Sequence, residues 1–216
     1  MPPIRRISVF RPKEIKLMPN GSYIITSPEM TTGWAKISLH VPEASKITVT
    51  YGEKLKDNGY VQKIGVDEGH NAEWWPDCYI QQDNFITDGG KNILEPKFSY
   101  KGFRYIQIDG CPCEITENNI EIYRIANDVK STSEFSCSNE LINKLHEIMK
   151  RTLLNNFQGK PTDTPVWEKN GWLGDANCAL NIMMLNFGMD KYMRSFVDIM
   201  DDCFKEYGKV PVIVPT

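Results

Sequence analysis

The stretch Gly33-Trp-Ala-Lys-Ile-Ser-Leu-His-Val41 shows most clearly how the first part of the chain folds. From Ala35 onward every second side chain is apolar, and the side chains between them are polar. Residues 46–52, with the sequence KITVTYG, repeat the same alternation. A period of two residues is typical of an antiparallel strand with one buried face. The pattern therefore predicts a strand at each of these two places.

Four further short segments have the composition of strands, and turns containing Pro, Gly or Asn separate them. They are SYIITS (22–27), CYIQQ (78–82), FRYIQIDG (103–110) and IEIYRI (120–125). The polar, glycine-containing residues 54–77 predict a long loop. Strands at this density, with no helical segment between them, predict an antiparallel β-sandwich over residues 1–125.

The spacing of apolar residues changes to a helical period after residue 128, and residues 126–137 are expected to be a linker. Ser138 is the expected N-cap of a first helix, and a second helix, over 175–187, is apolar on nearly every side. A third begins at Asp190 and ends at Gly208. Three helices cannot cover such faces among themselves. Residues 138–216 are therefore expected to be the first part of a larger helical domain. The apolar stripe of the first helix consists of Leu141, Leu145, Ile148, Met149 and Leu153.

Composition excludes several classes of function. The 25 Lys and Arg residues against 28 Asp and Glu give a net charge of −3, which does not favour a nucleic-acid partner. No apolar run reaches the roughly 18 residues that a membrane span needs. The beginning, MPPIRRISVF, lacks the apolar core of a secretion signal, so a cytoplasmic location is expected rather than a periplasmic one. The six cysteines lack the spacing of a zinc site, and no metal or cofactor is expected.

Acidic and tryptophan residues are concentrated in one loop between the first two predicted helices, PTDTPVWEKNGWLGD (161–175). Tryptophan rings stack on the apolar faces of sugars, and carboxylates bind their hydroxyls. A carboxylic acid beside an indole has surroundings that raise its pKa, as a general acid requires. From the residues alone, an ordinary capping loop, in which Asp175 is an N-cap and the tryptophans fill the core, is slightly favoured, because acid-rich caps and buried tryptophans are common.

The segment TDTPVWEKNGWLGDA (162–176) resembles the sugar-site loop of bacterial α-L-rhamnosidases of glycoside hydrolase family 78, which is typically T-D-C-P-x-R-E-x-x-G-W-x-G-D-A. Residues 126–159 are similar to the linker and first catalytic helix of that family. Residues 31–59 and 98–110 are similar to strands of the β-sandwich that precedes its catalytic barrel. The resemblance covers nearly the whole chain.

This resemblance implies an (α/α)₆ barrel and inverting hydrolysis of terminal α-L-rhamnosides, with a rhamnose-containing glycoside or polysaccharide as the partner. Glu168 matches the general acid, and Asp163, Trp172 and Asp175 match residues that hold or flank the rhamnose. Trp167 stands where the family usually has arginine, so it joins the candidate substrate-binding residues and leaves the preferred sugar open.

Inverting hydrolysis also needs a second carboxylate, about 6.5–9.5 Å from the acid, as the general base. In this family the base comes from much later in the barrel, so the 216-residue chain is expected to be inactive alone. Two alternatives stay open. One is a non-catalytic carbohydrate-binding β-sandwich, in which Trp74 and Trp75 form a sugar-stacking lip rather than a hydrophobic plug. The other is an (α/α)₆ hydrolase that acts on a different sugar.

Overall fold

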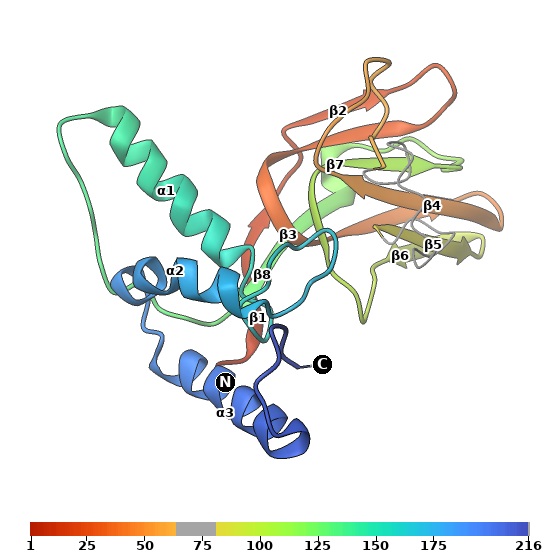
Figure 1. Cartoon of the computed structure of the whole chain (residues 1–216). Helices are drawn as coiled ribbons and strands as arrows, with labels where there is room; N and C mark the ends of the chain where they lie inside the picture. Colours follow the sequence, from red (N-terminus) through yellow and green to blue (C-terminus); the bar gives the residue numbers. More distant parts are fainter. Residues whose placement is uncertain (64–80, 216) are drawn as a thin grey trace. The chain divides into compact units, whose positions relative to one another are not determined.

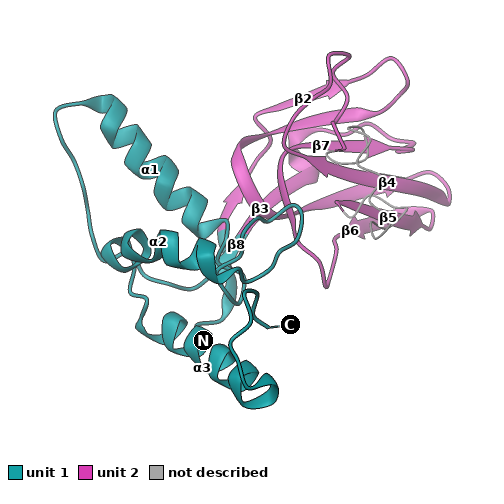
Figure 2. Cartoon of the chain, in the orientation of Figure 1, with its two compact units in different colours: residues 1–7, 125–216 teal, residues 8–124 magenta. Residues whose placement is uncertain are grey.

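The computed structural model describes residues 1–63 and 81–215 and divides into two compact units, coloured separately in Figure 2. One unit contains residues 8–124, and the other contains residues 1–7 and 125–216. The pair Trp74 and Trp75, and most of the expected loop at 54–77 and strand at 78–82, lie outside the described residues.

A curled antiparallel sheet forms the first part of the described chain (Figure 1). The strand order is β1-β8-β3-β7-β4-β5, with β2 and β6 both paired to β3. The strands are β1 (Ile4–Phe10), β2 (Glu14–Leu17), β3 (Tyr23–Val41), β4 (Ser45–Gly52), β5 (Gln82–Thr87), β6 (Gly90–Leu94), β7 (Lys101–Asp109) and β8 (Ile120–Asn127). The predicted antiparallel β-domain is confirmed as one curled sheet rather than as two separate sheets.

Strand β3 causes the curl, because it changes partners along its 19 residues. Its first half pairs with β2 and β7, and its second half pairs with β8 and β6. The change occurs at Gly33, which is opposite Lys101 in β7 and Arg124 in β8. Two strands were predicted at 22–27 and 33–41, and that separation is wrong. A register shift between Thr26 and Thr31 accommodates Pro28 as an irregularity within one strand.

One hydrophobic core is enclosed by both halves of the curled sheet. The apolar positions 35, 37, 39 and 41 are all buried, whereas Ser38 and His40 are exposed, which confirms the predicted alternation. Ile25 from the first half of β3 and Ile37 from its second half belong to the same core cluster. The aromatic centre of that cluster is an edge-on contact between Tyr51 and Phe103, with ring centroids 4.9 Å apart.

Three helices follow, as predicted: α1 (Glu140–Leu154), α2 (Leu173–Asn186) and α3 (Asp190–Tyr207). The N-cap of α1 is Asn139, whose side chain accepts the N–H of Leu141, so the prediction of Ser138 as the cap is wrong. Gly208 ends α3 in the left-handed conformation, with φ of 68°. No helix in the described ranges has the length and apolarity needed to cross a membrane.

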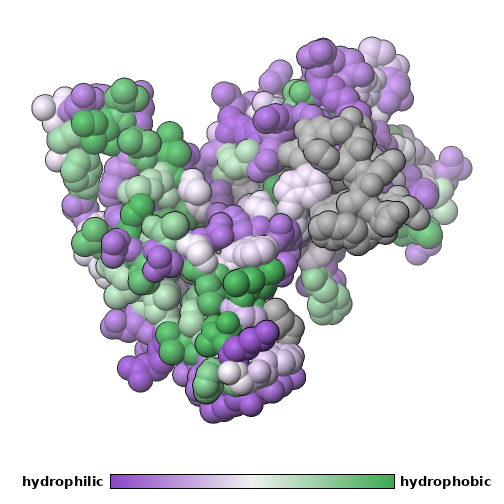
Figure 3. All heavy atoms as spheres, in the orientation of Figure 1, coloured by the Kyte–Doolittle hydropathy of each residue, from purple (hydrophilic) through white to green (hydrophobic). Residues whose placement is uncertain are grey.

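The helical unit has a small core and a large exposed apolar surface. Phe157, Phe187 and Tyr192 form the aromatic centre of that core. The predicted stripe on α1 is mostly exposed, because Leu141 retains 74% and Leu145 62% of its accessible area. The space-filling view shows apolar side chains gathered over the helices (Figure 3). Exposed apolar residues of this unit include Ile142, Ile148, Met184, Leu185, Val197 and Phe204.

Candidate functional site

The loop between α1 and α2 is anchored to the end of α1 by Asn156. The backbone N–H of Thr162 donates to the carbonyl of Asn156 at 2.9 Å, and the Thr162 hydroxyl donates to the Asn156 side-chain oxygen at 3.1 Å. Phe157 and Pro161 form an isolated antiparallel bridge just beyond the helix. Asn156 therefore determines where the acidic part of the loop begins.

Residues 163–170 are closed into a ring by two hydrogen bonds between its ends. The backbone N–H of Asp163 donates to the carbonyl of Asn170 at 3.0 Å, and the backbone N–H of Asn170 donates to Asp163 Oδ1 at 2.7 Å. Lys169 adopts a φ of 55°, a conformation that costs a non-glycine residue about 1 kcal/mol or more. Lys169 directly follows Glu168. The two hydrogen bonds that close the loop therefore also fix the backbone of Glu168.

Asp163 is a half-buried carboxyl. Burial raises the pKa of Asp163 above its usual value, and the charge of Glu168 adds to the rise. The N–H of Asn170 and other backbone donors oppose this by stabilising the ionised form. Burial lowers the pKa of Lys160, while the nearby Asp163 opposes that shift. Lys160 therefore places a cation near the carboxylate on the same loop.

Substitutions of Asp163 test whether its hydrogen bond with Asn170 holds the loop closed. Asp163→Asn keeps an oxygen for the Asn170 N–H, so the free energy of unfolding should change by less than about 0.5 kcal/mol. Asp163→Ala removes that acceptor and should cost about 1–2 kcal/mol. Urea denaturation of the two variants measures the difference. Equal losses in both variants would show that the hydrogen bond does not hold the loop.

Glu168 and Trp172 are in direct contact. The Trp172 indole Nε1–H donates to Glu168 Oε2 at 2.6 Å. Glu168 is exposed, and Trp172 is half-buried at the N-cap of α2. The hydrogen bond orients one oxygen of the Glu168 carboxyl. The closed loop of residues 163–170 fixes the backbone that carries this side chain.

Residues 212–214 form backbone hydrogen bonds with the end of this loop, which the sequence did not predict. The Val214 N–H donates to the Gly171 carbonyl at 3.0 Å, and the Leu173 N–H donates to the Val212 carbonyl at 2.9 Å. A Cβ at Gly171 would lie 2.2 Å from the Val214 carbonyl oxygen. Only glycine allows this close approach, so Gly171 is required by packing.

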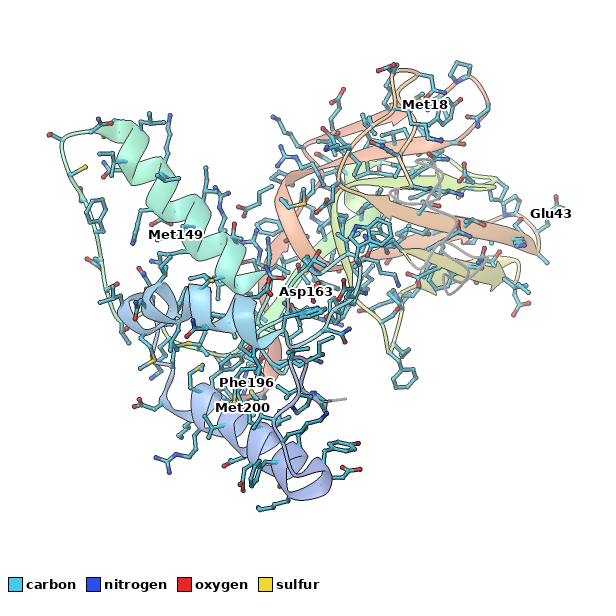
Figure 4. All side chains as sticks on the ribbon, viewed as in Figure 1. Met18, Glu43, Met149, Asp163, Phe196 and Met200 are labelled. Atoms are coloured by element: carbon cyan, nitrogen blue, oxygen red, sulfur yellow. The ribbon has the colours of Figure 1, made fainter. Side chains whose placement is uncertain are left out.

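A cleft of about 490 Å³ lies between the end of α1, the loop and α2. Asp163 and Asp175 both line it, and Asp163 is labelled in Figure 4 near the start of α2. Asp175 is an exposed residue in the first turn of α2 and is not its N-cap, so that detail of the capping-loop interpretation is wrong. The apolar wall consists of Leu153, Phe157, Pro161, Ala176, Ala179, Ile182 and Met183.

Four of the five candidate residues thus form two groups, and Trp167 belongs to neither. Asp163 and Asp175 line the cleft, whereas Glu168 and Trp172 form the hydrogen-bonded pair on the same loop. Trp167 is half-buried and directly precedes Glu168. Within residues 1–63 and 81–215, no three His, Cys, Asp or Glu side chains come together as a metal site would require. The sequence did not single out Lys160 or Asn170, because their roles depend on loop closure.

Comparisons with known proteins agree on one family. Residues 16–126 match the bacterial α-L-rhamnosidase concanavalin-like domain, and residues 130–216 match the bacterial α-L-rhamnosidase 6 hairpin glycosidase domain. An α-L-rhamnosidase of Formosa agariphila is 32% identical over 199 residues, which are 92% of this chain and 20% of that protein. This chain therefore spans about a fifth of the length of that relative.

Solved structures give the same result. The α-L-rhamnosidase structure from Dictyoglumus thermophilum has a TM-score of 0.87 and 31% identity, covering 99% of this chain and 23% of that one. The Streptomyces avermitilis α-L-rhamnosidase complexed with L-rhamnose also has a TM-score of 0.87, at 19% identity, covering 100% of this chain and 20% of that one. At that lower identity the likeness concerns the fold alone.

Proposed function

Since this chain belongs to the bacterial α-L-rhamnosidase family, glycoside hydrolase family 78, we propose that it acts as part of a hydrolase of terminal α-L-rhamnosides. Residues 1–125 are its β-domain, residues 126–137 its linker, and residues 138–216 the beginning of an (α/α)₆ barrel. Residues 130–216 match a six-hairpin glycosidase domain, which supports the assignment to a barrel. The three helices of this chain would form only part of that barrel.

Glu168 is the general acid of the proposed reaction. It is exposed, and its Oε2 accepts the indole N–H of Trp172 at 2.6 Å, which is the observation that carries the assignment. With Oε2 held as an acceptor, the proton of the neutral acid belongs on Oε1. From there it is transferred to the glycosidic oxygen as the bond to the leaving group breaks.

The cleft lined by Asp163, which is on the same loop as Glu168, is the proposed place for the rhamnose. Asp163 and Asp175 are positioned to accept hydrogen bonds from sugar hydroxyls, and the apolar wall suits the methyl group of a 6-deoxy sugar. Its volume of about 490 Å³ lies within the usual range of small-molecule sites. Trp167 directly precedes the acid, at the position where the family pattern has arginine, and is the proposed determinant of sugar preference.

A second carboxylate is needed to activate water on the opposite face of the sugar. Asp163 is a poor candidate, because its Oδ1 already closes the loop that carries Glu168. We assign the base to a part of the enzyme outside these 216 residues. Under this assignment, the activated water attacks the anomeric carbon directly from the face opposite the leaving group, so the reaction inverts the configuration.

A chimeric enzyme tests this proposal. In a chimera, the 199 matching residues of this chain replace the corresponding segment of the Formosa agariphila relative, which supplies the rest of the enzyme. The chimera is expected to release nitrophenol from p-nitrophenyl α-L-rhamnoside, and the isolated chain to show at least about 10³-fold lower activity. Hydrolysis by the isolated chain at the rate of the chimera would refute the assignment of the base. A panel of aryl glycosides on the chimera tests the role of Trp167 in sugar choice.

A further inference from the structure

A pair of cysteine thiols lies in the β-domain, outside the proposed site. Cys111 and Cys113 flank Pro112 in the connection between β7 and the short 3₁₀ helix η1 (Glu117–Asn119). Both thiols are free and half-buried, and both pack against the core of the curled sheet. Their sulfur atoms are 3.6 Å apart, and the Cys111 thiol also contacts the Cys113 carbonyl oxygen at 3.4 Å.

The local sequence explains why the two sulfur atoms meet. The connection bends at Cys113, and both cysteine side chains pack against the core of the curled sheet. Pro112 fixes its own φ between them and limits the freedom of the turn. A disulfide has an S–S distance of about 2.05 Å, so closing the bond requires a movement of about 1.5 Å. Cys137, Cys178 and Cys203 lie on other parts of the chain, and Cys178 is exposed on α2.

We propose that Cys111 and Cys113 are a reversible thiol–disulfide pair, oxidised by a small disulfide such as oxidised glutathione. One thiol loses its proton and attacks the reagent, which forms a mixed disulfide and releases one molecule of reduced glutathione. The second thiol then attacks the mixed disulfide and releases the second molecule. Two protein thiols are oxidised to one disulfide, and one glutathione disulfide is reduced to two thiols.

The surroundings of the pair make the Cys111 thiol slow to react near neutral pH. Burial raises the pKa of Cys111 to about 11, and the neighbouring Cys113 thiol adds to the rise. Cys111 is therefore a protonated thiol near neutral pH, and reaction should become faster as the pH increases. The same connection contributes Glu114 and Thr116 to one wall of a groove of about 480 Å³. Oxidation would thus restrain one wall of that groove.

The test uses the native full chain in buffers of oxidised and reduced glutathione, followed by acid quenching, alkylation and trypsin. Both thiols lie in a single tryptic peptide, residues 105–124. Its mass should fall by about 2 Da with no alkyl group added, and excess reductant should reverse the change. The internal disulfide should exceed the mixed disulfide on this peptide by at least about tenfold. The exposed Cys178, which serves as the control, should instead form a mixed disulfide.

Either of two results would overturn the proposal. One is a glutathione adduct that accumulates on peptide 105–124. The other is a peptide that remains doubly alkylated under conditions in which Cys178 reacts. In Cys113→Ser, the loss of about 2 Da should disappear while the circular dichroism spectrum stays native. Because the wild-type peptide gives the primary result, a folding defect in the variant leaves the test intact.

Discussion

Glu168→Gln in the chimera is expected to lower the hydrolysis of an alkyl α-L-rhamnoside by about 10³-fold. The amide has nearly the same shape as the acid and retains an oxygen for the Trp172 indole N–H, so the loop should keep its geometry. It has no acidic proton to give to the leaving oxygen. An alkoxide leaves very slowly without that proton, and the loss should appear in kcat as well as in kcat/KM.

The leaving group separates a general acid from a residue that only holds the sugar. A nitrophenolate leaves readily without a proton, so p-nitrophenyl rhamnoside should lose at least about tenfold less activity than the alkyl rhamnoside. Glu43→Gln, an exposed change in a turn of the β-domain, is the matched control and should leave both rates unchanged. Equal losses on the two substrates would assign Glu168 to binding and leave the acid unidentified.

Residue types gave a hypothesis for the chemistry of the site, whereas its contacts could be found only in the structure. Acids interleaved with tryptophans favoured a sugar site, and the general-acid role that the resemblance implies for Glu168 stays a prediction. The indole–carboxylate hydrogen bond and the closing bonds between Asp163 and Asn170 depend on backbone torsions, including the positive φ of Lys169. Support from the tail at Val214 joins segments more than 40 residues apart, so no local pattern could reveal it.

The fold could be predicted where apolar and polar residues alternate regularly along the sequence. Alternation correctly gave the buried face of β3, yet it could not show that β3 continues through Pro28. Lys101 illustrates a second limit. It begins β7 with only 1% of its area exposed and forms an ion pair with Asp83. A lysine is ordinarily predicted to be at the surface, and the half-buried Asp83, together with the Ser99 hydroxyl, accounts for the position of Lys101.

Gly33→Ala is expected to reduce the free energy of unfolding of the β-domain by more than about 3 kcal/mol. Gly33 is the residue at which β3 changes from β7 to β8 as its partner. A Cβ at this position would lie 1.9 Å from the Tyr123 carbonyl oxygen and 3.0 Å from its carbonyl carbon. Both are backbone atoms of β8, so no side chain can move aside, and the two strands would have to separate.

Separation of β3 from β8 would also disturb the contacts of the buried Arg124. The expected cost is therefore larger than that of a local clash. Arg124, opposite Gly33, donates to the Thr31 hydroxyl at 3.0 Å and pairs with Glu29 at 3.2 Å. Hydrogen exchange of the β3 and β8 amides measures the opening free energy of these strands directly. Gly89→Ala, whose Cβ would find its nearest neighbour at 3.4 Å, should change it by less than about 0.5 kcal/mol. Equal effects of the two substitutions would mean that β3 does not depend on a close approach at Gly33, and the curl of the sheet would need another cause.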